Sequence, residues 1–420
     1  MTSGPAQLPR RLGTADAILL GLGSMIGAGV FAVFGPAARA AGSGLMEGLV
    51  LAAAVAYANA AASAQLAVAY PTSGGTYVYG RERLGEWWGF VAGWGFVVGK
   101  SASCSAMALT FAAYLLPEGI ARRAVAVAAV AVLAAVNYRG VTRTAVATRV
   151  LVAITLTCLT VVVGAIWLAG PGTPDLSRPL GASGVYGVLQ AAGLLFFAFA
   201  GYARIATLGE EVVEPRRTIP RAILGALAIV VVVYLVVGWT ALAAAGPDVL
   251  ATSSAPLRDA VLRVGLDGLA PVVQAGAAIA SLGALLALLA GIGRTSLAMA
   301  RNGDLPRVLA AVHPRFASPH RAELVLAVAV AAAAALFDLR QAIGFSSFGV
   351  LVYYGIANAA AFTQGTPDRR WPRALNAFGL LGCAVLALTL PWPSMLSGAA
   401  VLALGVAGRA VVQGTRSRAA

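Results

Sequence analysis

Four glycines interrupt the first apolar segment of the sequence, at Gly21, Gly23, Gly27 and Gly29. Each glycine in a helix interior costs up to about 1 kcal/mol relative to alanine, so this run weakens the helix that the segment would otherwise form. Close packing against a neighbouring helix would explain Gly23 and Gly27 alone. We favour a break from Ser24 to Gly27, after which free amides begin a second half-helix and can bind an anionic group.

A second apolar segment contains a similar weak point, because Gly201 stands between three phenylalanines at 196–199 and Tyr202. The aromatic rings can simply face lipid or the protein core, but beside a glycine they also suit a gate over a small bound solute. Two broken helices at matching positions are typical of carriers that are built from an inverted repeat and bind their solute near the bilayer midplane.

The chain contains a single lysine, Lys100, in the middle of an apolar segment between Trp94 and Tyr114. A charge at membrane depth costs about 3 kcal/mol on insertion scales and normally marks a functional site. Arginine supplies the other cations, so a lone lysine indicates an ammonium that can lose its proton. The alternatives are that Lys100 snorkels to an interface or pairs with a structural acid.

These residues lie in a chain of 420 residues that is 60% hydrophobic and only 11% charged. The apolar residues form blocks of roughly twenty, the length that a helix needs to cross the hydrocarbon core. Lipid offers no hydrogen-bond partners, so such blocks must be helices, and we predict an all-α polytopic membrane protein. About twelve spans are expected, near 14–40, 45–69, 87–116, 121–138, 149–169, 186–212, 221–245, 270–300, 322–337, 341–363, 374–391 and 394–412.

The two broken helices are the first and sixth of these spans, so they begin two blocks of five, as a 5+5 inverted repeat requires. Two extra helices then follow the repeats. The expected divisions are a cytoplasmic segment at 1–13, a single transporter domain at 14–413 with repeats at about 14–169 and 186–363 and extra helices at about 374–412, and a cytoplasmic tail at 414–420.

The formal net charge of +14 comes from arginines in short loops between the apolar blocks. They are more frequent in the loops on the side of the N-terminus, which predicts that both termini lie in the cytoplasm. A nucleic-acid partner would require the basic residues to cluster on a soluble face, so we expect none. The predicted location is the cytoplasmic membrane.

The sequence lacks the residues that an enzyme, a channel or a metal-binding protein would need. Cys104, Cys158 and Cys383 fall within apolar stretches at spacings that suit no metal. An enzyme would need a histidine at membrane depth, a Gly-x-Ser-x-Gly elbow or paired intramembrane carboxylates, and a channel would favour a charged ring or a pore-lining repeat. No phosphate-binding loop is present either, so we predict a carrier with no cofactor and no metal.

Several motifs together resemble one family, the amino acid–polyamine–organocation permeases, which have the leucine-transporter fold. The resemblance covers nearly the whole chain. Its motifs are Gly-Ser-Met-Ile-Gly-Ala-Gly-Val-Phe at 23–31, Tyr-Pro-Thr-Ser-Gly-Gly-Thr-Tyr at 70–77, Gly-Glu-Glu at 209–211 with Pro215 and Pro220, and Ala-Arg-Asn-Gly-Asp-Leu-Pro at 300–306.

The resemblance implies a site built largely from backbone atoms. The substrate carboxylate would meet the amides around Gly27, Ala28 and Gly29, and its ammonium would meet the carbonyls of Met25, Phe197 and Ala200. Phe197, Phe199 and Tyr202 would form the aromatic gate and pocket wall. The expected substrate-binding residues are Ser24, Met25, Ile26, Gly27, Ala28, Gly29, Phe197, Phe199, Ala200, Gly201 and Tyr202.

Two departures from the family pattern concern coupling. Relatives that cotransport protons look as if they keep a lysine in span five, and alignment on 140–141 puts Thr155 there. Many also carry an acidic residue two positions after the span-six glycine, where this chain has Ala203. We therefore expect Lys100 to replace the missing lysine, and we treat Lys100 and Thr155 as the coupling candidates.

The expected substrate is a neutral amino acid, because no acidic side chain falls at these positions to bind a second cation. A basic amino acid or a polyamine is the alternative, since Glu47 could reach the pocket. Symport with a proton, exchange for a counter-substrate and facilitation all remain open. The other expected partner is the lipid bilayer.

Overall fold

The computed structural model describes residues 12–71, 74–139, 145–173, 184–206, 212–316, 318–366 and 369–419, and these form helices and turns with no strand. The predicted all-α class is therefore confirmed. In chain order the helices are α1 Thr14–Met25, α2 Ala28–Ala32, α3 Phe34–Ala41, α4 Leu45–Ala69, α5 Thr76–Leu84, α6 Glu86–Leu115, α7 Ile120–Tyr138, α8 Ala145–Leu168, α9 Gly184–Phe199, α10 Ala203–Ala206, α11 Pro215–Thr252, α12 Pro256–Arg263, α13 Ala270–Arg301, α14 His320–Leu336, α15 Leu339–Phe362, α16 Arg373–Thr389 and α17 Trp392–Ala419.

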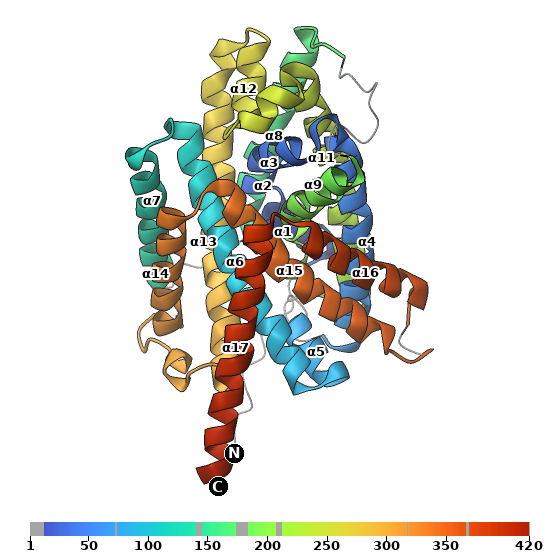
Figure 1. The fold of residues 1–420 in the computed structure, drawn as a ribbon, viewed down its shortest axis with the longest axis vertical. Coiled ribbons are helices and arrows are strands. Elements are labelled where there is room, and N and C mark those ends of the chain that lie inside the picture. The colour runs from blue at the N-terminus through green and yellow to red at the C-terminus, as the bar shows by residue number, and fades with distance from the viewer. Residues whose placement is uncertain are drawn as a thin grey trace.

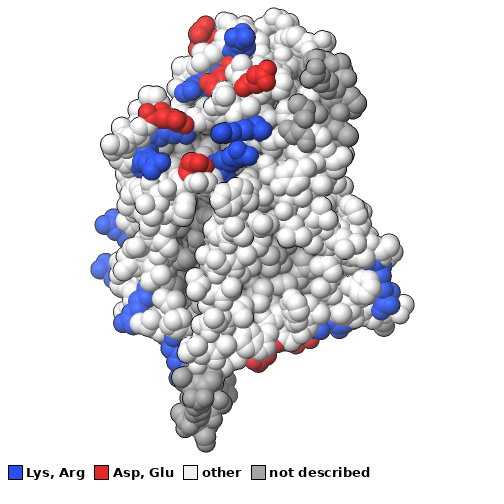
Figure 2. Space-filling model, viewed as in Figure 1, with Lys and Arg blue, Asp and Glu red and all other residues white. Residues whose placement is uncertain are grey.

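The helices have the length and composition of a membrane protein. Within the described ranges, nine helical stretches are long and apolar enough to cross a bilayer, and α9 and α16 are shorter apolar helices. On the face drawn in Figure 2, charged side chains gather near the upper end and along the left and lower margins, and they leave a broad uncharged area over the middle of the face. The chain is thus a multi-pass membrane protein, while the count of twelve spans and the inverted repeat stay predictions.

The first expected span is broken where the glycines predicted. Helix α1 ends at Met25, and α2 begins at Ala28 after the non-helical residues Ile26 and Gly27. Helix α3 then continues almost directly, because Val33 between them keeps helical backbone angles. This segment therefore consists of two half-helices that meet at Ile26 and Gly27.

The sixth expected span is also broken. Helix α9 ends at Phe199, and only the short α10 follows the turn at 200–202. The break predicted at Gly201 within the expected span 186–212 is therefore present. Residues 207–211, which carry the Gly-Glu-Glu motif, lie outside the described residues, as do 1–11 of the expected N-terminal segment.

Helices α6 and α15 pack closely against each other in the core, and both are deeply buried. Small residues let their backbones approach, because a methyl group added at Gly99 would lie only 3.1 Å from Cα of Gly349. Ser103 and Ser346 then join the two helices through a hydrogen bond of 2.6 Å between their hydroxyls. This contact fixes the helix that carries Lys100.

A buried ion pair holds the C-terminal helix to the end of the bundle where α5 lies, which we call the α5 end (lower part of Figure 1). Arg409 of α17 and Asp304, just after α13, are 2.9 Å apart, and each side chain is only 3% exposed. The Arg409 guanidinium also lies over the rings of Trp87, at 4.5 Å, and Phe90, at 5.1 Å. These contacts attach α17 to the start of α6.

Helix α5, which lies between two of the expected spans, brings further groups to Asp304. The Tyr77 hydroxyl donates to the Asp304 carboxylate at 2.7 Å, and Arg81 lies 3.3 Å from the same oxygen. Burial raises the pKa of Tyr77 to about 12, so its hydroxyl stays protonated as a donor at neutral pH. Asp304 thus joins α5, α13 and α17.

We predict that Asp304→Asn lowers the thermal unfolding midpoint of the detergent-purified protein by several degrees. Removing one partner of a buried ion pair typically costs about 3–5 kcal/mol, because the other charge stays buried. The control is Glu214→Gln, which removes an exposed pair with Arg217 whose side chains are 66% and 75% exposed. Such pairs contribute roughly 0–1 kcal/mol. An Asp304→Asn midpoint equal to that of the control would contradict the prediction.

Candidate functional site

The two helix breaks contact each other directly. The Ser24 hydroxyl lies 2.8 Å from the Gly21 carbonyl oxygen in its own helix and 2.8 Å from the Gly201 carbonyl oxygen in the other break. A methyl group added at Gly201 would lie 2.3 Å from the Ser24 carbonyl oxygen, closer than any real contact. Glycine at 201 is therefore required for space, and it lets the two backbones touch.

Glycines also shape the first break. The Gly27 amide donates to the Met25 carbonyl at 2.9 Å, which closes a tight turn between α1 and α2. A methyl group at Gly27 would lie 2.7 Å from Cβ of Ala284 in α13, and one at Gly29 would lie 2.8 Å from Cβ of Ala198 in α9. The turn is thus packed between α13 and α9 with no room for side chains at these two positions.

Tyr234 of α11 joins the two broken helices. Its hydroxyl lies 2.6 Å from the Met25 carbonyl oxygen and 3.1 Å from the Ala198 carbonyl oxygen. The ring packs on Phe199, with centroids 5.1 Å apart. One buried hydroxyl therefore lies within hydrogen-bond distance of carbonyls at the ends of both α1 and α9. Lipid could not donate a hydrogen bond to these carbonyls.

Lys100 and Tyr354 both donate hydrogen bonds to the carbonyl at the second break. The Lys100 ammonium nitrogen lies 3.0 Å from the Ala200 carbonyl oxygen, and the Tyr354 hydroxyl lies 3.2 Å from the same atom. Tyr354 is held by the Tyr202 ring at 4.8 Å and the Phe196 ring at 5.8 Å. The Ala200 carbonyl, which the resemblance assigns to a substrate ammonium, thus already receives an ammonium from the protein.

Lys100 is deeply buried, with 6% of its surface exposed, near the middle of α6. Within the described residues it takes part in no salt bridge, so no structural acid pairs with it there. Its polar contact is a backbone carbonyl instead.

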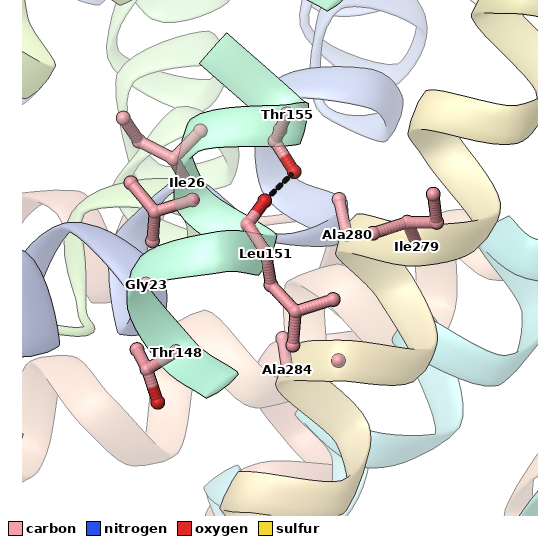
Figure 3. Close-up of a pocket in the computed structure, with 10 residues that line it drawn as sticks. Gly23, Ile26, Thr148, Leu151, Thr155, Ile279, Ala280 and Ala284 are labelled. Atoms are coloured by element: carbon pink, nitrogen blue, oxygen red, sulfur yellow. Dashed lines mark hydrogen bonds between the residues drawn. The ribbon is translucent and has the colours of Figure 1, made fainter. Parts of the chain in front are cut away.

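Thr155, the other coupling candidate, lies at a different place. Its hydroxyl donates to the Leu151 carbonyl of its own helix at 2.9 Å (Figure 3). It lines a cavity of about 20 Å³ between α1, α8 and α13, room for roughly one water. The other residues that line this cavity are Gly23, Ile26, Thr148, Leu151, Val152, Ile279, Ala280, Gly283 and Ala284. The cavity is too small for an amino acid.

The predicted site residues are therefore brought together only in part. Ser24 and Met25 lie against Gly201 of the other break, and Gly29 packs on Ala198 of α9. Gly27 faces Ala284 of α13 instead, and the Ala200 carbonyl meets Lys100 and Tyr354. Phe199 and Tyr202 pack on the tyrosines that hold the breaks. Ile26 turns to the small cavity, while Ala28 and Phe197 are simply buried.

Sequence reasoning missed Tyr234 and Tyr354. Both stand in the middle of apolar helices, and a tyrosine hydroxyl buried there usually needs a hydrogen-bond partner. That signal was present in the sequence, but it could not indicate which carbonyls the hydroxyls would reach. Glu47 lies in the same helix as Gly48, which packs against the Val188 carbonyl of α9. Val188 stands twelve positions before Ala200, a rise of about 18 Å in a helix.

Comparison with known proteins agrees with this architecture. The family described as amino acid permease matches residues 12–404. The chain belongs to this family. Over 409 residues it is 59% identical to an uncharacterized transporter of Mycobacterium tuberculosis (strain ATCC 25618 / H37Rv), which covers 97% of this chain and 92% of that protein.

More distant relatives of this permease carry names that include substrates. A branched-chain amino acid permease of Bacillus subtilis is 26% identical, over 96% of this chain and 93% of its own. The chloroplastic cationic amino acid transporter 6 of Arabidopsis thaliana is 29% identical, over 95% of this chain and 75% of its own. The family and these relatives support amino acid transport and point away from an enzyme.

We predict that Gly201→Ala reduces the initial rate of amino acid uptake at least about tenfold. The added methyl group would overlap with backbone atoms, which cannot move aside as the end of a flexible side chain could. The added methyl group would push the two breaks apart at Ser24. Gly164→Ala is the control, since nothing lies within 4 Å of a methyl group there. Uptake in proteoliposomes, normalised to folded protein, measures both. Full activity of Gly201→Ala would show that the backbones need not touch.

Proposed function

We propose that this permease is a secondary active carrier of a neutral amino acid that works by alternating access at the junction of its two broken helices. The contact between Ser24 and Gly201 carries the proposal, since it brings together the two helix ends at which polar backbone groups can face a solute. The multi-pass fold and the amino acid permease family support it.

In this proposal, the amides around Gly27, Ala28 and Gly29 bind the substrate carboxylate, and the Gly27 amide leaves the Met25 carbonyl to do so. The carbonyls of Met25, Phe197 and Ala200 accept from its ammonium. Side chains then close the pocket, with Phe199 and Tyr202 beside the second break and Phe197 at its wall. Ser24, Ile26 and Gly201 shape the turns that present these groups.

A neutral side chain suits this junction best. Within the described residues, the hydrogen bonds and packing contacts at the two breaks involve hydroxyls, carbonyls, rings and one lysine, with no carboxylate. The alternative is an exchanger of a basic amino acid or a polyamine, which the name of the Arabidopsis relative favours. A second cation beside Lys100 would have no acid among the described residues to balance it.

We further propose that Lys100 couples transport to protons, by alternating between a charged state on the Ala200 carbonyl and a neutral one. Buried lysines change protonation readily. Among the described residues, the titratable groups beside it include Cys104, one turn along α6, and Tyr354, which shares its acceptor. The proposed location is the cytoplasmic membrane with both termini inside, as the distribution of arginines favours.

Counterflow in proteoliposomes tests the proposed substrate class. Vesicles are loaded with one unlabelled amino acid or amine, and accumulation of the same labelled solute is followed at trace concentration. We expect accumulation with at least one neutral amino acid, because counterflow detects symporters, exchangers and facilitators alike. Accumulation only with polyamines or basic amino acids would favour the alternative, and none with any amino acid would refute the proposal.

We predict that Lys100→Met abolishes the response of uptake to an imposed pH gradient while leaving counterflow measurable. The neutral side chain can no longer carry a proton between the two states. Ser101→Ala is a matched control, because within the described part of the chain its hydroxyl bonds only to the Val97 carbonyl of the same helix. A pH response that survives in Lys100→Met would rule Lys100 out as the coupling group.

A further inference from the structure

The carbonyl oxygen of Ala200 has no free acceptor position. A carbonyl oxygen has two lone pairs, and here Lys100 donates to it from 3.0 Å and Tyr354 from 3.2 Å. A solute whose ammonium binds this carbonyl must therefore displace one of them. The Ala200 carbonyl oxygen is thus both an acceptor of hydrogen bonds within the protein and the proposed acceptor for the substrate ammonium.

Lys100 is the donor that can leave. Tyr354 is buried and packed against Tyr202, Tyr353 and Phe196, with ring centroids 4.8–5.8 Å away. Moving its hydroxyl would mean repacking three rings. Lys100 has a flexible four-carbon stem, and among the described residues the Ala200 carbonyl is its one hydrogen-bond partner.

A displaced Lys100 needs a new partner. Its ammonium is buried in α6, and a buried charge that lacks a partner costs several kcal/mol. In the described part of the chain its titratable neighbours are Cys104 and the tyrosines at the second break, and no carboxylate pairs with it. An incoming anion is what this site lacks.

We propose that an α-amino acid exchanges partners with Lys100: the substrate ammonium takes the Ala200 carbonyl, and the substrate carboxylate becomes the counterion of the Lys100 ammonium. The two substrate groups are attached to one carbon, so a carboxylate beside that carbonyl is within reach of the lysine. No covalent bond changes, and the net charge of the site is unchanged. This inference rests on the proposed function, because it places the substrate at the same junction.

The consequence is selection by class. A zwitterionic amino acid supplies both an ammonium for Ala200 and a carboxylate for Lys100. An amine or polyamine supplies only the first, so it would leave two ammonium groups together in a buried site where the described residues supply no anion. Lys100 is thus a specificity-determining residue that rejects amines. It would favour amino acids over polyamines, the alternative substrates that the sequence did not exclude.

The test compares amino acids with the amines that remain when their carboxylate is removed. The probes are alanine with ethylamine, leucine with 3-methylbutylamine, and phenylalanine with phenethylamine. Each is titrated as a competitor of counterflow and, separately, as a ligand that raises the thermal unfolding midpoint in detergent. In the native protein we expect an amine to bind at least about a hundredfold more weakly than its amino acid, since an unbalanced buried charge costs roughly 3 kcal/mol or more.

Substitutions of Lys100 identify the source of this difference. In Lys100→Met the amine should gain and the amino acid should lose affinity, so that the ratio falls below about ten. Lys100→Arg keeps a cation that cannot lose its proton, so it should retain the ratio even if its pH response is lost. Ser101→Ala should match the native protein. Lys100→Gln replaces Lys100→Met if the latter fails to fold.

Each result decides between distinct conclusions. An unchanged ratio in the neutral variant that folds, Lys100→Met or Lys100→Gln, overturns the partner exchange but leaves amino acid transport in place. Equal binding of amine and amino acid by the native protein also overturns it and favours the polyamine alternative. Absence of any amino acid binding or counterflow by folded native protein refutes the proposed function, and the inference fails with it.

Discussion

The structure depends on how backbone groups are satisfied where two helices stop inside the bundle. Helix ends leave carbonyls and amides without intrahelical partners, and lipid cannot supply them. Here Tyr234, Tyr354 and Lys100 reach these carbonyls from α11, α15 and α6. Ser24 adds a bond between the breaks themselves. The polar atoms that could bind a solute are therefore the same atoms that hold the broken helices in place, so binding and conformation share one set of hydrogen bonds.

The contact between the two helix breaks also buries little apolar surface. Gly201 meets a carbonyl group, and Gly29 meets Ala198, so little apolar surface is buried where the breaks touch. Larger side chains pack behind them, as Phe199 does on Tyr234. Separating two backbones that meet through glycine costs less than withdrawing an interlocked aromatic ring. This arrangement suits a junction that has to open and close.

The sequence predicted those parts of the fold that follow from local composition. Apolar blocks of membrane length indicated an all-helical protein, and the glycines located the end of α1 and the turn at Gly201 closely. The partners at the breaks could not be predicted, because Tyr234 meets Met25 across 209 positions and Tyr354 meets Ala200 across 154. Lys100 was identified from its residue type and depth alone. Its acceptor is a backbone atom, which carries no signature in a sequence.

The ion pair between Arg409 and Asp304 can form only late in synthesis of the chain. Ribosomes make Asp304 and α5 about a hundred residues or more before Arg409, and membrane chains are inserted from the N-terminus onward. Until α17 enters the bundle, the Asp304 carboxylate and the rings of Trp87 and Phe90 lack this guanidinium. Helix α17 therefore completes the α5 end, and a chain truncated before Arg409 would leave the buried Asp304 carboxylate without this arginine partner.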